Sequence, residues 1–455
     1  MTEEKLDFKK ILPIFIIVLV DLLGMTVIIP LLPLYATSFG ANAAMIGMLG
    51  ATYPMMQFIG APLLGRLSDR YGRKPILIIS QIGTFIGFIV LGIAHTLPLL
   101  FISRLIDGIS GANIATAQAA ISDSTTEKTR TQGLGLIGAA FGLGFIIGPV
   151  IAFVSLAVSN NNYRIPAFAA AIFSLLSILL TIFWFEETLP EEQRGHHSKK
   201  TTLSLNAMFQ ALRHPAVGIL LLLMFAQQIA FGGFEQLLSL FTLSRLGLNA
   251  SGNAVVFVFV GVIVVAVQGG LIGMWSRKYG DRKLIFGGLA LLAVGLTFIS
   301  VTPRQPVAWY SQAELTAELN TDSNQAETSS TQATSIDLPT EDDKGWWGLI
   351  WLLAAMIPAG IGGGILQPAI NSLITKRVQP GEVGGMLGIS SAFLSGANAL
   401  APLIGGALFQ GLGSTAPFLA GGALMGILLL LALSQVKPGR EETAVPGLAR
   451  GKSAH

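Results

Sequence analysis

Four ionisable residues stand inside otherwise apolar stretches of this 455-residue chain: Asp21, Arg104, Asp107 and Glu235. A charge in an apolar environment is costly, so each needs a partner, a water-filled cavity or a proton. Arg104 and Asp107 are three residues apart, and on one helix face they could simply neutralise each other. No second basic residue lies in such a stretch to pair with Asp21 and Glu235. These two acids are therefore predicted to bind and release protons.

The apolar stretches around these residues are long enough to cross a membrane. Hydrophobic residues make up 52% of the chain and charged residues only 12%, against about 25% charged in soluble domains. Runs of about 20 apolar residues, the length that crosses about 30 Å of hydrocarbon as a helix, predict twelve spans. They lie near residues 11–36, 43–65, 76–95, 97–121, 132–158, 165–185, 216–243, 252–275, 284–302, 346–375, 383–409 and 415–436. We expect an all-α, multi-pass membrane protein, because the runs lack the alternation of a spanning barrel.

The positions of Lys and Arg predict the orientation in the membrane. With the N-terminus inside, 23 of the 28 basic residues fall in inside segments and four fall outside, namely Arg164, Arg245, Arg304 and Lys344. Basic residues accumulate in cytoplasmic loops, so both termini are predicted to be cytoplasmic. The net charge of +3 then reflects topology and gives no indication of nucleic-acid binding.

Two polar segments divide the chain. Residues 186–214 are charged and are predicted to be a cytoplasmic linker between an N-terminal half, 1–185, and a C-terminal half, 215–437, followed by a cytoplasmic tail, 438–455. His196 and His197 in the linker could bind a metal, although a solvated linker is the favoured interpretation and we predict no metal site. Residues 303–345 are acidic and rich in Ser, Thr and Gln, which predicts a flexible external loop.

The two halves repeat each other. Gly65-Arg-Leu-Ser-Asp-Arg-Tyr-Gly-Arg-Lys74 has a near copy that begins at Gly273, 208 residues later, whereas Pro149 in span 5 matches Pro402 in span 11 at an offset of 253. The difference of 45 residues is nearly the length of the loop after span 9. Two parallel six-span repeats, the second with an inserted loop, explain both offsets.

These motifs resemble the major facilitator superfamily, and within it the twelve-span drug/proton antiporters that include bacterial tetracycline and multidrug exporters. The resemblance rests on three motifs. They are the loop Gly65, Asp69, Arg70, Gly72, Arg73 and Lys74; Arg104 with Gly108 and Gly111 in span 4; and Gly135, Gly144, Gly148 and Pro149 in span 5. Two glycines usually close the last motif, where this chain has Ala152 and Phe153.

The resemblance implies a major facilitator fold, with two six-helix repeats around a central cavity lined by spans 1, 4, 7 and 10. It places all four ionisable residues in that cavity, with Arg104 adjusting the proton affinity of Asp21 or Asp107. We expect the substrate cavity to include Asn113, Gln118, Gln227, Gln228, Phe231, Phe234, Gln367 and Asn371. The loop motif is expected to form a latch that stabilises the outward-facing state, with Asp69 bonded near span 11. The span 5 glycines are expected to pack against span 8.

The favoured function is proton-coupled efflux of lipophilic, drug-like molecules by a monomer in a bacterial plasma membrane, without a cofactor. A proton-coupled nutrient importer would share the fold and the loop motif, but not the glycine-proline motif of span 5. A membrane enzyme should show a catalytic constellation, and no phosphate-binding Gly-x4-Gly-Lys-Ser/Thr motif occurs. A sensor or scaffold is a third alternative. The absence of cysteine excludes disulfides and thiol catalysis.

Overall fold

The N-terminal half contains six spans in chain order. The computed structural model describes residues 8–111, 113–125, 130–194, 205–214, 217–321, 337–378 and 383–437, and regular structure in these residues is helical. The six spans are α1 (Phe8–Ile28) with α2 (Leu32–Ser38), α3 (Ala43–Tyr71), α4 (Arg73–Gly92), α5 (Leu97–Ser110) with α6 (Asn113–Asp123), α7 (Arg130–Ala157) and α8 (Arg164–Phe183). Spans 1 and 4 are therefore each built from two helices.

The C-terminal half repeats this order. Its spans are α10 (Gly218–Leu246), α11 (Ala250–Ala266) with α12 (Ile272–Tyr279), α13 (Asp281–Ser300), α15 (Trp347–Arg377), α16 (Val383–Leu412) and α17 (Ala416–Gln435). A π-helical turn, Val267–Leu271, joins α11 to α12. Two short α-helices of the described residues lie outside the spans, α9 (Leu205–Leu212) in the linker and α14 (Gln312–Thr321) in the loop after span 9, and a 3₁₀ turn, Glu191–Gln193, also lies in the linker.

The twelve predicted spans are present. Ten helices of the described residues are long and apolar enough to cross a membrane, and α3 and α11 are the remaining two spans. Spans 2 and 8 continue beyond their predicted ends to Tyr71 and Tyr279. Both stop at a glycine with positive φ, Gly72 at 105° and Gly280 at 79°, a backbone conformation that other residues rarely adopt. Residues 66–71 and 276–279, which lie beyond the predicted span ends, are therefore helical.

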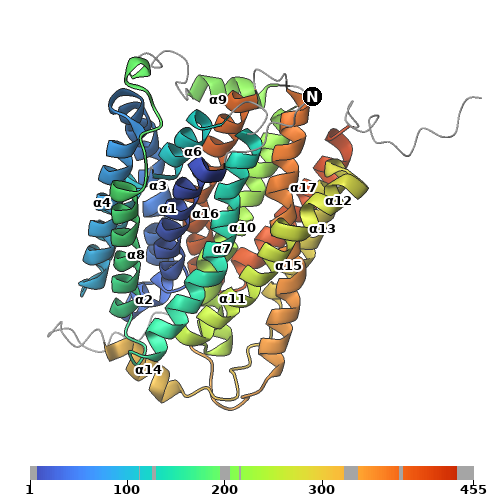
Figure 1. The fold of residues 1–455 in the computed structure, drawn as a ribbon. Helices are drawn as coiled ribbons and strands as arrows, with labels where there is room; N and C mark the ends of the chain where they lie inside the picture. The colour runs from blue at the N-terminus through green and yellow to red at the C-terminus, as the bar shows by residue number, and fades with distance from the viewer. Residues whose placement is uncertain are drawn as a thin grey trace, which may run out of the picture.

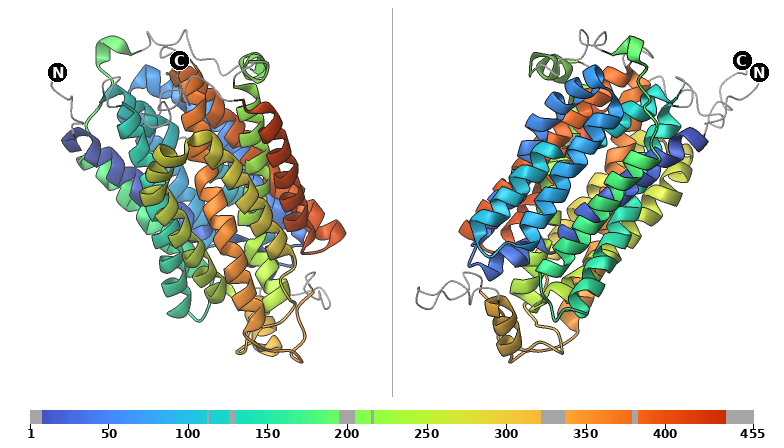
Figure 2. Two further views of the ribbon diagram at one scale, coloured as in Figure 1. Left: turned by 90° about the vertical axis from the view of Figure 1, so that its right-hand side faces the viewer. Right: turned by 60° about the vertical axis from the view of Figure 1, so that its left-hand side comes forward.

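The bundle has two ends, which Figures 1 and 2 show in three views. We call the end that carries α9 and the Gly72 turn the linker end, and the opposite end, which carries α14, the α14 end. α9 lies at the top of Figure 1 and α14 at the bottom. Predicted linker residues 195–204, loop residues 322–336 and tail residues 438–455, including His196 and His197, lie outside the described residues.

The two halves meet along two seams, α3 with α16 and α7 with α11. Toward the α14 end the seams are tight: a Cβ on Gly47 would lie 2.3 Å from the Pro402 carbonyl oxygen, and one on Gly261 would lie 2.6 Å from the Phe145 carbonyl oxygen. Toward the linker end, a Cβ on Gly65 or Gly138 would meet no described atom within 4 Å. The halves are therefore in close contact toward the α14 end.

Candidate functional site

A cavity of about 660 Å³ lies between the two halves. Such a volume suits a drug-sized ligand. Its N-terminal wall includes Met25, Ile28, Ile29, Leu32, Tyr53, Pro54, Gln57, Arg104, Ile114, Phe141 and Phe145. Its C-terminal wall includes Gln227, Gln228, Phe231, Phe234, Glu235, Gln236, Phe257, Gln268, Gln367, Asn371, Leu394 and Asn398. The first wall is mainly apolar, and the second combines aromatic rings with amides and an acid.

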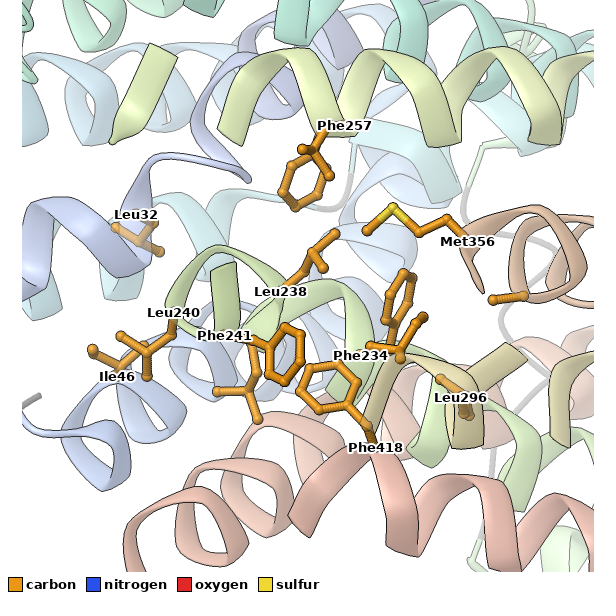
Figure 3. Close-up of a cluster of buried hydrophobic side chains, with 14 of the residues drawn as sticks. Leu32, Ile46, Phe234, Leu238, Leu240, Phe241, Phe257, Leu296, Met356 and Phe418 are labelled. Carbon is orange, nitrogen blue, oxygen red and sulfur yellow. The ribbon is translucent and has the colours of Figure 1, made fainter. Parts of the chain in front are cut away.

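Glu235 places a carboxyl group in this cavity. It belongs to α10, where Phe231 and Phe234 contact each other with ring centroids 5.6 Å apart. Phe234 also packs edge-on against Phe418, and Figure 3 shows it beside Phe241 and Phe418 in the buried cluster behind the cavity. This packing holds Phe234 firmly, so α10 presents Glu235 from a rigid apolar support.

The amide groups of the C-terminal wall are only partly satisfied. Gln228 donates to the Asn398 oxygen at 2.8 Å. The side-chain oxygens of Gln227, which is 1% exposed, and Asn371 are buried and accept no hydrogen bond from the described residues. Buried acceptors without a donor cost about 1–3 kcal/mol each. Both residues line the cavity, so a change of side-chain rotamer could bring either oxygen to a ligand.

Arg104 and Asp107 form a buried ion pair, with Nη1 and Oδ2 3.1 Å apart. The guanidinium also lies 5.6 Å from the centre of the Phe88 ring. Arg104 lines the cavity but Asp107 does not. A charge left alone here by loss of its partner would cost about 3–5 kcal/mol, so the pair neutralises both groups inside the span.

Asp21 lies away from the central cavity, in contrast to the prediction. It is 8% exposed and faces a separate cavity of about 10 Å³ between α1, α4 and α6, lined by Gln81 and Asn113. The amide of Asn113 donates to one carboxyl oxygen of Asp21, and the other oxygen has no described partner. Asp21 also lies close enough to Asp107 for the two carboxyl groups to interact electrostatically. The face of α1 that carries Asp21 turns into the N-terminal half.

Six of the eight residues predicted to line the cavity do so: Gln227, Gln228, Phe231, Phe234, Gln367 and Asn371. Asn113 binds Asp21 instead, and Gln118 is an exposed residue of α6 outside the cavity lining. Sequence reasoning missed Tyr53, Gln57, Gln236, Gln268 and Asn398. Most of these lie on spans 2, 8 and 11, which were not expected to face the cavity, and Gln268 lies in the π-helical turn.

Comparison with known proteins assigns the chain to a family. The model of the Major Facilitator Superfamily matches residues 14–316 and 344–453. The chain belongs to this superfamily. The tetracycline resistance protein of class E from Escherichia coli is 31% identical over 66% of this chain and 74% of its own length. Multidrug resistance protein 1 of Bacillus subtilis is 28% identical over 85% of this chain and 86% of its own length.

Solved structures of low sequence identity share the fold. A D-xylose–proton symporter superposes with a TM-score of 0.69 at 17% identity, covering 95% of this chain and 98% of its own. The human organic anion transporter MFSD10 superposes with a TM-score of 0.61 at 21% identity, covering 94% and 100%. The chain is thus a multi-pass membrane protein of the major facilitator fold, and its superfamily consists of transporters rather than enzymes.

The loop motif of this superfamily member is bonded within its own half. Arg73 contacts Asp69 at 2.6 Å and Asp123, at the end of α6, at 2.9 Å. We expected Asp69 to bond near span 11, but in this structure its carboxylate is bonded to Arg73 of the same half. A Cβ on Gly65, on the same stretch of α3, would meet no described atom within 4 Å.

At the position that corresponds to Arg73, the second copy of the loop motif carries a negative charge. Asp281 occupies the position of Arg73 and is bonded to Lys376, at the end of α15, at 2.6 Å. It also accepts hydrogen bonds from Ser276 and Ser372. In each half, therefore, a buried charge at the start of the third span binds the end of the fourth. The sign of that charge is exchanged between the halves.

The glycines of span 5 face two directions. A Cβ on Gly148 would lie 2.2 Å from Thr26 Oγ1, and one on Gly144 would lie 3.4 Å from Thr26 Cγ2, so both pack on α1 within the same half. Contact with span 8 comes instead from Gly142, whose Cβ would lie 3.3 Å from Val265, and from Phe145. The helical rotation of about 100° per residue separates these two faces of α7. The surroundings of Gly135 fall outside the described part of the chain.

Proposed function

We propose that the chain exports lipophilic, drug-like molecules in exchange for protons, by alternating access of the central cavity. The observation that carries this proposal is the carboxyl group of Glu235 in a cavity with an apolar wall and an amide-bearing aromatic wall. Support comes from the relatives, which are resistance proteins for tetracycline or for multiple drugs. A sugar site needs polar groups on several sides, and the largely apolar N-terminal wall argues against one.

The walls of the cavity suggest an amphipathic, cationic substrate. A positive charge would lie near Glu235, a flat apolar face would pack against Phe141 and Phe145, and hydrogen-bond donors would face Gln227 and Asn371. When such a ligand displaces water, buried acceptors without a donor would weaken its binding. The cavity should therefore favour a cation with hydroxyl or amide groups over one with a purely hydrocarbon surface.

The basic residues support placing the linker end in the cytoplasm. Arg66, Arg70, Arg73 and Lys74 lie at this end, and so do Arg277, Lys278, Arg282 and Lys283. Basic loops are retained on the cytoplasmic side of a plasma membrane. In that orientation the cavity opens to the cytoplasm and is closed to the outside. One chain contains both repeats and the whole cavity, so we propose that the monomer is the working unit.

Two separate acids allow protons to drive the exchange. A proton that moves inward gains about 2.3 kcal/mol per 100 mV and about 1.4 kcal/mol per pH unit. Exchange of one proton for one monovalent cation is electroneutral, so only the pH difference drives it. Asp21 binds no substrate in this arrangement because it lies outside the cavity. If Asp21 carries a second proton, the exchange moves net charge, and the membrane voltage drives it as well as the pH difference.

The proposal is tested in inside-out membrane vesicles with an imposed pH gradient. We expect a cationic fluorescent dye and a tetracycline to accumulate, and D-xylose not to. Glu235→Gln should abolish dye uptake because the cation loses its counter-charge. Asp21→Asn should retain dye binding and uptake driven by the pH gradient, but lose the additional uptake that an imposed membrane potential gives. Gln227→Leu should raise the KM about tenfold for a donor-bearing substrate, with little effect on tetraphenylphosphonium.

Glu192→Gln is the matched control, since Glu192 is an exposed acid of the linker. It should behave as wild type. If Glu235→Gln and Asp21→Asn both take up dye at wild-type rates under a pH gradient and a membrane potential, Glu235 is not the substrate counter-charge and Asp21 is not a proton carrier. Gradient-driven movement of a nutrient in the opposite direction would replace the exporter with an importer.

A further inference from the structure

The loop after span 9 contains a helix, α14, that the superfamily model matches only in part. The match stops at residue 316 and resumes at 344, whereas α14 runs from Gln312 to Thr321. Residues 317–321 of α14 therefore lie outside the match. The sequence predicted a flexible loop here, and the described parts, 303–321 and 337–345, are instead packed against the bundle.

The inserted segment is attached to the C-terminal half. Val307 N donates to the Leu246 carbonyl oxygen at 3.0 Å. The ring of Tyr310 covers Gly247, whose left-handed φ of 64° ends α10, and a Cβ on this glycine would lie 2.3 Å from the ring. Tyr310 also donates to the Pro339 carbonyl oxygen at 2.9 Å. These contacts fix the start of α14 against the end of span 7.

From this base α14 reaches the N-terminal half. It packs against α2, and its residues Leu315 and Leu319 are buried in the main hydrophobic cluster. Glu318, on the same helix, accepts hydrogen bonds from Asn161 at 3.0 Å and from the Tyr163 hydroxyl at 3.4 Å, both in the turn between α7 and α8. One carboxylate thus binds the external turn of the opposite half.

The same carboxylate also binds the C-terminal half. Asn249, which caps the start of α11, donates to Glu318 at 3.4 Å, and the backbone N–H of Ala250 donates as well. Ser251 in turn donates to the Asn161 oxygen at 2.7 Å. Donors from both halves therefore converge on Glu318, and Asn161 is bonded to both α14 and α11.

The backbone around Asn161 is specialised for this contact. Asn160 and Asn161 both have positive φ, 52° and 60°, and asparagine tolerates this region better than most residues that carry a side chain. The turn directs the Asn161 amide toward Glu318 and Ser251. Glycine at this position would keep the backbone and remove only the side chain.

We propose that α14 is a clamp, in which Glu318 bonds the turn of residues 160–163 to the start of α11 and so holds the two halves together at the α14 end. When the halves separate at this end, the base at Tyr310 moves with one half and Asn161 with the other. Every separation must therefore break the Glu318–Asn161 and Ser251–Asn161 bonds. The clamp favours the conformation that is open at the linker end.

The clamp is tested by spin-label distances across the α14 end. The chain has no cysteine, so Val158→Cys and Leu412→Cys label only one exposed site on each half, 78% and 74% exposed. Glu318→Ala and Asn161→Gly should each raise the ratio of long to short distances at least about fivefold. Glu318→Gln retains an acceptor oxygen and should stay within about twofold of wild type.

Glu314→Ala is the control, because Glu314 is an exposed acid one turn earlier on α14. It should leave the distances unchanged. Wild-type distances in both Glu318→Ala and Asn161→Gly would overturn the clamp, and so would an equal shift in Glu314→Ala. The proposal rests on the alternating access assumed above, but the distances need neither substrate nor gradient. A failure of drug efflux would therefore be recognised separately from a failure of the clamp.

Discussion

Asp21 and Glu235 are both acids in apolar spans, yet the fold gives them different neighbours. Glu235 faces the central cavity and can meet a substrate directly. Asp21 binds Asn113 inside the N-terminal half and has its own small cavity. A proton on Asp21 therefore need not compete with a substrate for the same carboxylate. Coupling between the two sites can pass through α1, whose residues Met25, Ile28 and Ile29 line the central cavity beyond Asp21.

At Glu318 the clamp should depend on pH with a definite sign. Burial raises the pKa of Glu318 above its ordinary value of 4.5, and hydrogen bonds from Asn249, Tyr163 and Asn161 only partly offset this. Tyr163 is the titratable group that faces it, and no described cation forms an ion pair with it. The closed end thus binds a proton more tightly than the open end.

Acid should therefore strengthen closure of the α14 end. The preference for the closed end is fully present below pH 4.5 and decreases as the pH rises through the raised pKa of Glu318. The distance between labels at Val158 and Leu412 should report this change, and Glu318→Gln should remove that part of the pH dependence. Opening of the α14 end on acidification, abolished by the same substitution, would show that the sign is wrong.

At the scale of helices, α7 offers a matched pair of glycines. Gly148→Ala would place its Cβ 2.2 Å from Thr26 Oγ1 and 2.8 Å from the Thr26 backbone, whereas Gly144→Ala would make an ordinary contact of 3.4 Å. We expect Gly148→Ala to cost about 1–3 kcal/mol of stability because α7 must move away from α1. Thermal unfolding of the detergent-solubilised protein should show a lower midpoint for Gly148→Ala, with Gly144→Ala close to wild type. Equal midpoints would contradict this packing.

The positions of the helices could be predicted from the sequence better than the directions in which their residues face. Twelve apolar runs and two copies of the loop motif suffice for the spans and the repeat. Asp21 was misplaced because the sequence does not show which face of α1 meets the cavity. Gln268 was missed because nothing in its neighbourhood predicted a π-helical turn. α14 was missed because its composition is that of a flexible loop, and it is ordered by contacts with residues more than sixty positions away.

At the scale of the whole molecule, the two seams act as one gate. Both close toward the α14 end, and Glu318, Asn161 and Ser251 bond the halves at the same end. Transport by alternating access requires this end to open once in each cycle. A covalent link across it should therefore stop the cycle while the cavity stays open at the linker end.

Asn161→Cys with Ser251→Cys supplies such a link. The two native side chains are 2.7 Å apart at their hydrogen-bonded atoms, so a short bifunctional methanethiosulfonate reagent can bridge them. We expect the bridged protein to bind a cationic dye in inside-out vesicles but not to accumulate it under a pH gradient. Reduction should restore accumulation, and each single-cysteine variant treated with the reagent should remain active. Accumulation at the unbridged rate by fully bridged protein would show that the α14 end does not open during transport.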